Sequence, residues 1–153
     1  MTKAQIEKSL AAARDAAARL RAAPAGVKND ALSRLEGALL LRTPEILKAN
    51  AQDLKALPKS AAPAFRERLT LTAERIQQMA ASLASVRALT DPVGEEVSRA
   101  VLPSGLLLRR VRAPLGVIFL IYESRPNVAI EAFSIAFKAG NAIILRGGRE
   151  SKH

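Results

Sequence analysis

The sequence predicts an α/β protein in which a helical segment, a β-hairpin and a β-α-β unit follow one another. Residues 1–90 carry apolar side chains at spacings of three and four, which is typical of amphipathic helices. Two β-prone runs flank a Pro-Ser-Gly turn at 103–105, which is the pattern of a hairpin. Two short apolar runs then enclose a helical pattern, which indicates parallel strands joined by a crossover helix. We therefore divide the chain into segments 1–90, 91–113 and 114–153.

The first helix is expected to end at the Ala-Pro-Ala-Gly segment, residues 23–26. Its apolar face consists of Ile6, Leu10, Ala13, Ala17 and Leu20. This Ala- and Arg-rich N-terminus has some features of a transit peptide, but Glu7 and Asp15 favour an ordinary amphipathic helix. Asn29 or Asp30 is expected to cap a second helix.

Clear start signals mark the later helices. Thr43 is expected to cap a third helix, with Pro44 at its first position, and this helix runs to Leu57. Residues 60–69 read as a connector with a short turn of helix. Thr72 then opens a long helix, and the side chains that it is expected to bury are Ile76, Met79, Ala80, Leu83 and Val86.

The second arm of the hairpin carries charge on both of its faces. Leu107, Arg109 and Val111 alternate with Leu108, Arg110 and Arg112. A strand of this kind does not suit the inside of a core, so we expect a sheet edge or a solvated contact between subunits.

The last forty residues predict a right-handed β-α-β unit. Residues 116–122 are apolar on both faces, as in a strand buried in a parallel sheet. Residues 127–140 are helical in pattern, with Asn127 as a candidate cap and Gly140 as the stop. Residues 142–145 form the second buried strand.

Composition narrows the chemistry. The chain has 153 residues, no Cys and a single His, which excludes disulfides, thiolate sites and a Cys nucleophile within it, and argues against a His-based zinc site. The longest apolar run has ten residues, and a membrane span needs about 20. The net charge is +10, and half of this excess falls in residues 109–153, where eight Lys and Arg meet three Asp and Glu. An anionic partner is therefore expected there.

The segment Tyr122–Asn127, YESRPN, is a candidate binding site. It follows the first buried strand at its C-terminal end, where ligands bind in open α/β sheets. Polar side chains cluster there beside Pro126, namely Glu123, Ser124, Arg125 and Asn127. The alternative is a helix-capping loop with a solvated Arg125, and the residues alone leave both interpretations open.

The segment after the second strand is a candidate phosphate site. Gly147 and Gly148 allow a close approach of a phosphate to the backbone, and Arg146 adds a forked donor. Further donors follow at Arg149, Ser151 and Lys152. The pattern G-x-G-x-x-G is absent, so a plain turn is the alternative. A nucleic-acid patch is a further alternative for the basic runs, although aromatic residues for base stacking are few.

The run RAPLGVIFLIYESRPNVAIEAFSIAFKAGNAIILRGGRES (112–151) closely resembles the glutamate-5-semialdehyde dehydrogenases, or γ-glutamyl phosphate reductases, of the aldehyde dehydrogenase superfamily. The resemblance extends upstream, in order, through ANAQDL (49–54), RLTLTAERI (68–76), DPVG (91–94) and LPSGLLLRR (102–110). The run IYESRPN followed at this distance by GNAIILRGG is the most specific part.

The resemblance implies NADPH-dependent reduction of γ-glutamyl phosphate to glutamate-5-semialdehyde in proline biosynthesis, within a Rossmann-like cofactor domain in the cytoplasm. It implies a substrate-side cleft and a cofactor-binding set. The cleft would hold Glu123, Ser124, Arg125 and Asn127, and NADP would bind at Tyr122, Pro126, Arg146, Gly147, Gly148 and Ser151. The hairpin 97–112 would join subunits of a homo-oligomer, with no nucleic acid or membrane as partner.

The family also uses a nucleophilic Cys that lies C-terminal of this region, and this sequence has none. The resemblance therefore implies the first third or so of the enzyme, inactive alone. The alternatives are a non-catalytic subunit that associates with the full-length enzyme through the hairpin, and a basic nucleic-acid-binding module.

Overall fold

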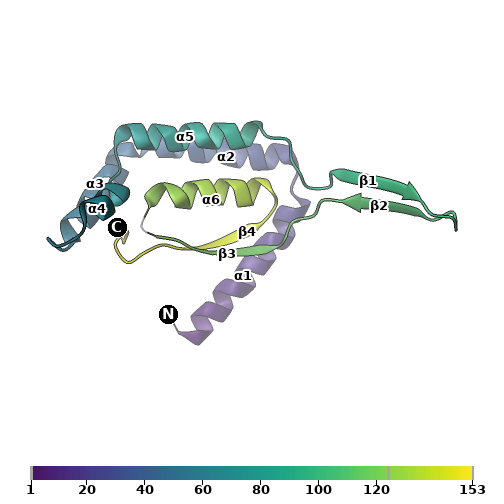
Figure 1. Ribbon diagram of the computed structural model, residues 1–153, viewed down its shortest axis with the longest axis horizontal. Coiled ribbons are helices and arrows are strands. Elements are labelled where there is room, and N and C mark those ends of the chain that lie inside the picture. Colours follow the sequence, from purple (N-terminus) through teal and green to yellow (C-terminus); the bar gives the residue numbers. More distant parts are fainter. Residues whose placement is uncertain (1, 124, 153) are drawn as a thin grey trace.

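The computed structural model describes residues 2–123 and 125–152 and confirms the α/β class. Figure 1 shows three helices, α2, α5 and α6, packed beside a short sheet, with a hairpin that projects from the body of the molecule. The elements are α1 (Lys3–Ala22), α2 (Ala25–Leu41), α3 (Thr43–Ala56), α4 (Pro63–Leu69), α5 (Ala73–Ala88), β1 (Glu96–Val101), β2 (Leu107–Val111), β3 (Val117–Ile121), α6 (Pro126–Lys138) and β4 (Ala142–Arg146).

The hydrophobic core lies between α2 and α5, and α6 packs against it. Thr72 caps α5 as predicted, since its side chain accepts a hydrogen bond from the Arg75 N–H at 3.2 Å. All five side chains expected on the inner face of α5 are buried. Phe133 and Phe137 of α6 stack with ring centroids 5.2 Å apart and contact this core. The helical segment and the β-α-β unit therefore share one core.

Two of the helix starts predicted in residues 1–90 are wrong. The helix α2 begins at Ala25 directly after Pro24, four residues before the expected cap at Asn29 or Asp30. Pro24 ends α1, and the residues after it are free to turn into a helix at once. Thr43 is the first residue of α3 rather than its cap, and its hydroxyl donates to a carbonyl at the end of α2 at 3.1 Å. The short connections between successive helices, rather than the local capping residues, therefore determine where α2 and α3 begin.

The strands β3 and β4 pair in parallel, as predicted, with α6 on one side of the pair and α1 crossing the other (Figure 1). The expectation that the first strand is buried on both faces is wrong. Phe119 is 58% exposed and Ile121 is 68% exposed. The sheet has two strands within the described residues, and α1 packs more on β4 than on β3. One face of β3 is therefore open. Along α1, Ala17 is buried whereas Ile6 and Leu10 are exposed.

Gly140 ends α6 as predicted, with a φ of +77°. A Cβ at this position would lie 2.9 Å from Pro114 Cγ and 3.0 Å from Val93 Cγ2. Both the backbone conformation and the space exclude a side chain here. This close approach seats the end of α6 against the two segments that enter and leave the hairpin.

The hairpin β1–β2 is antiparallel with a bulge between Glu96 and Ser98, and all of its strand residues are exposed. Glu96 receives hydrogen bonds from Arg99 at 2.9 Å and from Arg109 at 2.7 Å. These two bonds, that of Arg99 first, lower the pKa of Glu96 below its ordinary value. Arg99 and Arg109, which are partners across the hairpin, are therefore both held by the Glu96 carboxylate.

A buried polar network joins α2, α5 and α6. Lys28 of α2 is fully buried, and its ammonium nitrogen lies 2.5 Å from Asp91 Oδ2 and 3.2 Å from the Lys138 carbonyl oxygen. The Lys138 ammonium, also buried, donates to Asn29 Oδ1 at 2.6 Å and to the Arg87 carbonyl oxygen at 2.9 Å. Asn29, expected as a helix cap, is therefore a partner of Lys138 inside this network. The two buried ammonium groups of Lys28 and Lys138 are thus stabilised by one carboxylate, that of Asp91, and by neutral oxygen acceptors.

Burial raises the pKa of Asp91, but the hydrogen bonds from Lys28 and from the Val93 N–H, with the charges of Lys28 and Lys138, outweigh burial. The pKa of Asp91 therefore lies below its ordinary value. The carboxyl group is held in its ionised form, which is the form that both buried lysines require.

We expect Asp91→Asn to destabilise the fold by about 3 kcal/mol or more, because it leaves the buried Lys28 ammonium without its counter-charge. Since folding lowers the pKa of Asp91, its contribution is complete above the unfolded-state pKa of about 3.9 and is lost as the pH falls through the folded-state pKa. Urea unfolding from neutral pH downwards measures this. The wild type should show an acid loss of stability that Asp91→Asn lacks.

The matched control for this substitution is Asp30→Asn, which neutralises an exposed aspartate on the same helix as Lys28. It should leave the free energy of unfolding nearly unchanged at neutral pH. Equal stabilities of the two variants would contradict the prediction.

Candidate functional site

The two predicted binding segments leave the sheet at the same edge. Ile121 at the end of β3 is paired with Arg146 at the end of β4, and the Tyr122 N–H donates to the Arg146 carbonyl at 3.1 Å. Because the strands are parallel, the residues after Ile121 and after Arg146 emerge side by side. This is the edge at which open α/β sheets bind ligands.

At this edge, the aromatic ring of Tyr122 packs on Gly147. A Cβ at Gly147 would lie 3.1 Å from Tyr122 Oη and 3.2 Å from Tyr122 Cζ. The φ of Gly147 is not in the left-handed region, so space rather than backbone conformation explains this glycine. The close approach expected at this position is made by the Tyr122 ring. Gly148, which follows, is half-buried.

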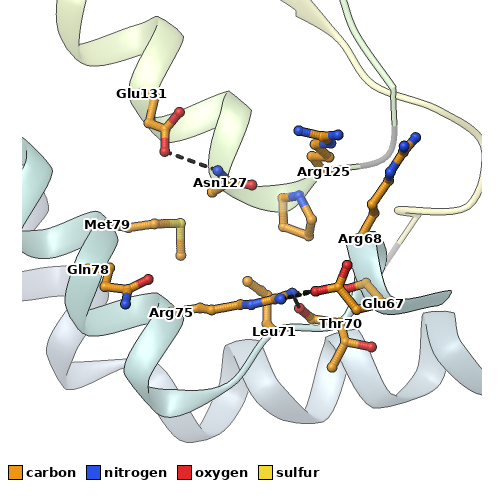
Figure 2. A pocket seen from close by; sticks show the side chains of 11 residues that line it. Glu67, Arg68, Thr70, Leu71, Arg75, Gln78, Met79, Arg125, Asn127 and Glu131 are labelled. Carbon is orange, nitrogen blue, oxygen red and sulfur yellow. Dashed lines mark hydrogen bonds and ion pairs between the residues drawn. The ribbon is translucent and has the colours of Figure 1, made fainter. Parts of the chain in front are cut away.

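An open cavity of about 370 Å³ lies between the N-terminal end of α6, the start of α5 and the α4–α5 connection (Figure 2). Two of the predicted cleft residues line it, Arg125 and Asn127, together with Pro126 from the predicted cofactor-binding set. The other lining residues are Glu67, Arg68, Thr70, Leu71, Arg75, Gln78, Met79 and Glu131. The cavity therefore combines the YESRPN loop with residues that lie about fifty positions earlier.

The floor of the cavity is a fixed framework around Arg75. Its guanidinium group donates to the Glu67 and Thr70 carbonyl oxygens at 2.8 and 2.6 Å, and it forms an ion pair with the Glu67 carboxylate. Figure 2 shows Arg75 lying across the base of the cavity, joined to these groups by dashed lines. Arg75 is thereby neutralised and held by the α4–α5 connection.

The other two arginines of the cavity, Arg68 and Arg125, are less fully paired than Arg75. Arg68 reaches Glu123 of the YESRPN loop at 3.4 Å, and both side chains are largely exposed. Arg125 forms no ion pair with any residue in 2–123 or 125–152. In Figure 2 both guanidinium groups extend toward the top of the view, away from Arg75. Ser124, the remaining predicted cleft residue, lies outside the described residues.

The expectation that Asn127 caps α6 is wrong. The helix starts at Pro126 with Arg125 before it, because proline suits the first helical position. Asn127 therefore lies inside the first turn, and its side-chain amide donates to Glu131 Oε1 at 3.0 Å, one turn further along the helix. This bond orients both side chains along the wall of the cavity (Figure 2).

Buried polar residues of α3 hold the surrounding loops. Asn50 is 6% exposed, donates to the Leu69 carbonyl at 2.8 Å and accepts from the Leu71 N–H at 2.8 Å. It therefore fixes the end of α4, which carries Arg68, and the start of the connection to α5. Asp53, also buried, accepts from the Lys152 N–H at 3.1 Å and so holds the end of the segment that follows β4. In that segment Arg146 and Ser151 are exposed.

Sequence reasoning missed Arg68, Arg75 and Asn50 as parts of this site. The signal that could have found them is the resemblance itself, because RLTLTAERI and ANAQDL contain all three. No local pattern shows that these segments meet the YESRPN loop, since the contact is made only through packing of α3, α4 and α5.

The described residues lack the patterns of a metal site and of a membrane-spanning helix. Within residues 2–123 and 125–152, no group of three His, Cys, Asp or Glu side chains could hold a metal ion. None of the described helices has the length and apolar character needed to cross a membrane.

No protein-family model matches the chain. Over 141 residues it is 52% identical to the gamma-glutamyl phosphate reductase of Gluconobacter oxydans, and over 142 residues 49% identical to that of Rhodopseudomonas palustris. Each alignment covers 92% of this chain and 33% of the relative. The chain thus spans about a third of the length of the curated relatives it matches.

Solved structures agree with these relatives. The crystal structure of gamma-glutamyl phosphate reductase from Thermotoga maritima matches with a TM-score of 0.86 and 41% identity, over 91% of this chain and 34% of that chain. The enzyme of the same name from Saccharomyces cerevisiae matches with a TM-score of 0.87 and 34% identity, over 99% of this chain and 38% of that chain.

We expect Asn50→Leu to lower the free energy of unfolding by about 2–4 kcal/mol, since it leaves the Leu69 carbonyl and the Leu71 N–H unpaired in a buried place. Urea unfolding measures the loss. Hydrogen exchange of the Leu71 amide should accelerate by more than the global loss explains. Gln52→Leu, an exposed change on the same helix, is the control and should cost little. An unchanged Leu71 amide in Asn50→Leu would refute the positioning role.

Proposed function

We infer that this chain, which is homologous to an N-terminal part of the gamma-glutamyl phosphate reductases, supplies cofactor and substrate contacts to such an enzyme. The reaction is the NADPH-dependent reduction of γ-glutamyl phosphate to glutamate-5-semialdehyde and phosphate, in proline biosynthesis in the cytoplasm. The observation that carries the proposal is the shared edge of β3 and β4. The YESRPN loop and the Arg146 segment leave the sheet there side by side, within a chain that aligns with these reductases along nearly its whole length.

The cofactor side fits an anionic dinucleotide. Arg146 is exposed at the end of β4 and forms no ion pair with the residues that the structure describes, so its guanidinium group is available to a phosphate. We assign the cofactor contacts to Tyr122, Pro126, Arg146, Gly147, Gly148 and Ser151. When bound, NADPH supplies the hydride. The task of these residues is to hold and orient it at the sheet edge.

The substrate side is the cavity beside α6. We assign its contacts to Glu123, Ser124, Arg125 and Asn127. Asn127 is oriented by Glu131 and stands in the first turn of α6, where the positive end of the helix dipole favours an anion. A side-chain amide beside a helix N-terminus suits an oxygen that gains negative charge during reduction of an acyl group.

The chain alone should not catalyse this reduction. The resemblance implies a Cys nucleophile, and these 153 residues contain no Cys. A spectrophotometric assay of the purified chain with NADPH and γ-glutamyl phosphate should therefore show no oxidation of NADPH above the rate without protein. Turnover by the pure chain would overturn this expectation.

In an enzyme that contains this segment, Arg146→Ala should raise the KM for NADPH far more than the KM for NADH. The 2′-phosphate of NADPH carries roughly two negative charges at neutral pH. Loss of one charged hydrogen-bonding partner should cost about 1.5–3 kcal/mol of binding. Steady-state kinetics with both cofactors measure the difference. Arg110→Ala, an exposed arginine on the hairpin, is the control and should leave both KM values unchanged. Equal losses for NADPH and NADH in Arg146→Ala would show that Arg146 does not recognise the 2′-phosphate.

A second candidate role is self-association through the hairpin 97–112. Val101, Leu107 and Val111 are all exposed on one face, around the arginines that Glu96 holds. An exposed strand pair with apolar side chains suits pairing between subunits. This role accommodates a homo-oligomer, or association of the chain with longer subunits.

We expect the double change Leu107→Asp and Val111→Asp to weaken self-association by tenfold or more, because it places charge in the apolar contact. Sedimentation equilibrium measures the dissociation constant. The double change Arg110→Ala and Ser98→Ala on the other face serves as the control. A wild-type chain that sediments as a monomer at every concentration would refute this role.

A further inference from the structure

The cavity beside α6 presents both signs of charge to a small ligand. Three arginines and two glutamates line it, but Arg75 and Glu67 are committed to each other. The side chains left to face a ligand are the cations Arg68 and Arg125 and the anion Glu131. Apolar contacts come from Leu71, Met79 and Pro126. The lining is therefore that of a site for a short aliphatic molecule with an ammonium group and a carboxylate.

The cationic half of the site lies just before α6. Arg125 has no ion-pair partner among the described residues, and Arg68 is only partly neutralised by Glu123 at 3.4 Å. A guanidinium group binds a carboxylate through two parallel N–H donors, and the adjacent helix N-terminus favours the same negative charge. This half therefore suits a carboxylate.

The anionic half is Glu131, which Asn127 holds by a hydrogen bond of 3.0 Å. Arg125 directly precedes α6, and Glu131 lies five residues, or about 7.5 Å, beyond Pro126 along the helix. The two long side chains can close on one small head group placed between them, on the wall that Figure 2 shows. A phosphate dianion would meet repulsion from Glu131, whereas an ammonium group would be attracted.

We propose that Arg125 and Arg68 bind the α-carboxylate, and Glu131 the α-ammonium, of the glutamyl group of the substrate. This assignment rests on the proposed function, and it makes the cavity the subsite for the amino-acid end of the molecule. The aliphatic carbons then lie along Leu71, Met79 and Pro126. A volume of about 370 Å³ accommodates such a head group.

The test uses three neutral-tailed probes with the 153-residue chain. L-Glutamine has both head groups, glutaramate lacks the ammonium, and γ-aminobutyramide lacks the α-carboxylate. Binding is followed by amide shifts of Asn127 and Leu71 in heteronuclear NMR titrations. L-Glutamine should bind at least about tenfold more tightly than either truncated probe, because each missing charge leaves a partner unmatched.

The variants match the probes one to one. Arg125→Ala should weaken L-glutamine and glutaramate by about tenfold and leave γ-aminobutyramide unchanged. Glu131→Gln keeps an acceptor for Asn127, and should weaken L-glutamine and γ-aminobutyramide but not glutaramate. Arg68→Ala should have a smaller effect, since Glu123 already occupies part of its charge. Arg110→Ala on the hairpin is the control and should change nothing.

Equal affinities for the three probes would overturn the subsite. So would variants whose loss of affinity is the same for every probe, whichever charged group the probe carries. NADPH binding is measured in the same samples by its fluorescence. A chain that ranks the probes as expected but does not bind NADPH would keep the subsite and count against the proposed function. A chain that binds NADPH but not L-glutamine would do the reverse.

Discussion

The ion pair between Lys28 and Asp91 is the interaction on which the arrangement of the site depends. It lies in the buried network that also includes Lys138, so α2, the end of α5 and the end of α6 are fixed to one another at a single point. The cavity lies at the other end of α5 and α6, between their N-terminal turns. A change of angle at the network would therefore be amplified along two helices of 16 and 13 residues, about 20 Å or more, before it reached the cavity.

A similar use of buried polar groups occurs on α3. Asn50 and Asp53 lie three positions apart on one face, and each binds a backbone group of a different loop. One loop follows Arg68 at the end of α4, and the other follows Arg146 at the end of β4. Because a buried amide or carboxylate must satisfy its hydrogen bonds, these residues fix loop positions that apolar packing alone would leave loose. If either loop moved away, Asn50 or Asp53 would be left buried with an unsatisfied polar group, so their burial favours the observed positions of both loops.

The sequence predicts elements better than it predicts contacts. The long helix after Thr72, the hairpin and the parallel strands follow from strong local patterns, and the structure confirms them. The starts of α2 and α6 were misplaced because Asn29 and Asn127 resemble caps but are used instead by Lys138 and Glu131. The site was predicted only in the half that lies on the YESRPN loop. Its other half is brought in by helix packing across about fifty residues, which no local signal records.

Five of the eight positively charged side chains in residues 109–153 fall into three groups with different surroundings. On the hairpin, Arg109 and Arg112 are paired with Glu96 and Glu95. Lys138 is buried in the network that fixes α6. Arg125 and Arg146 form no ion pairs among the described residues. Arg146 ends β4, and Arg125 directly precedes α6 in the loop that follows β3. A count of charges predicts an anionic partner for this segment, and the two exposed guanidinium groups of Arg125 and Arg146 are its candidate contacts. An anion bound at either position would meet a guanidinium group that no carboxylate among the described residues neutralises.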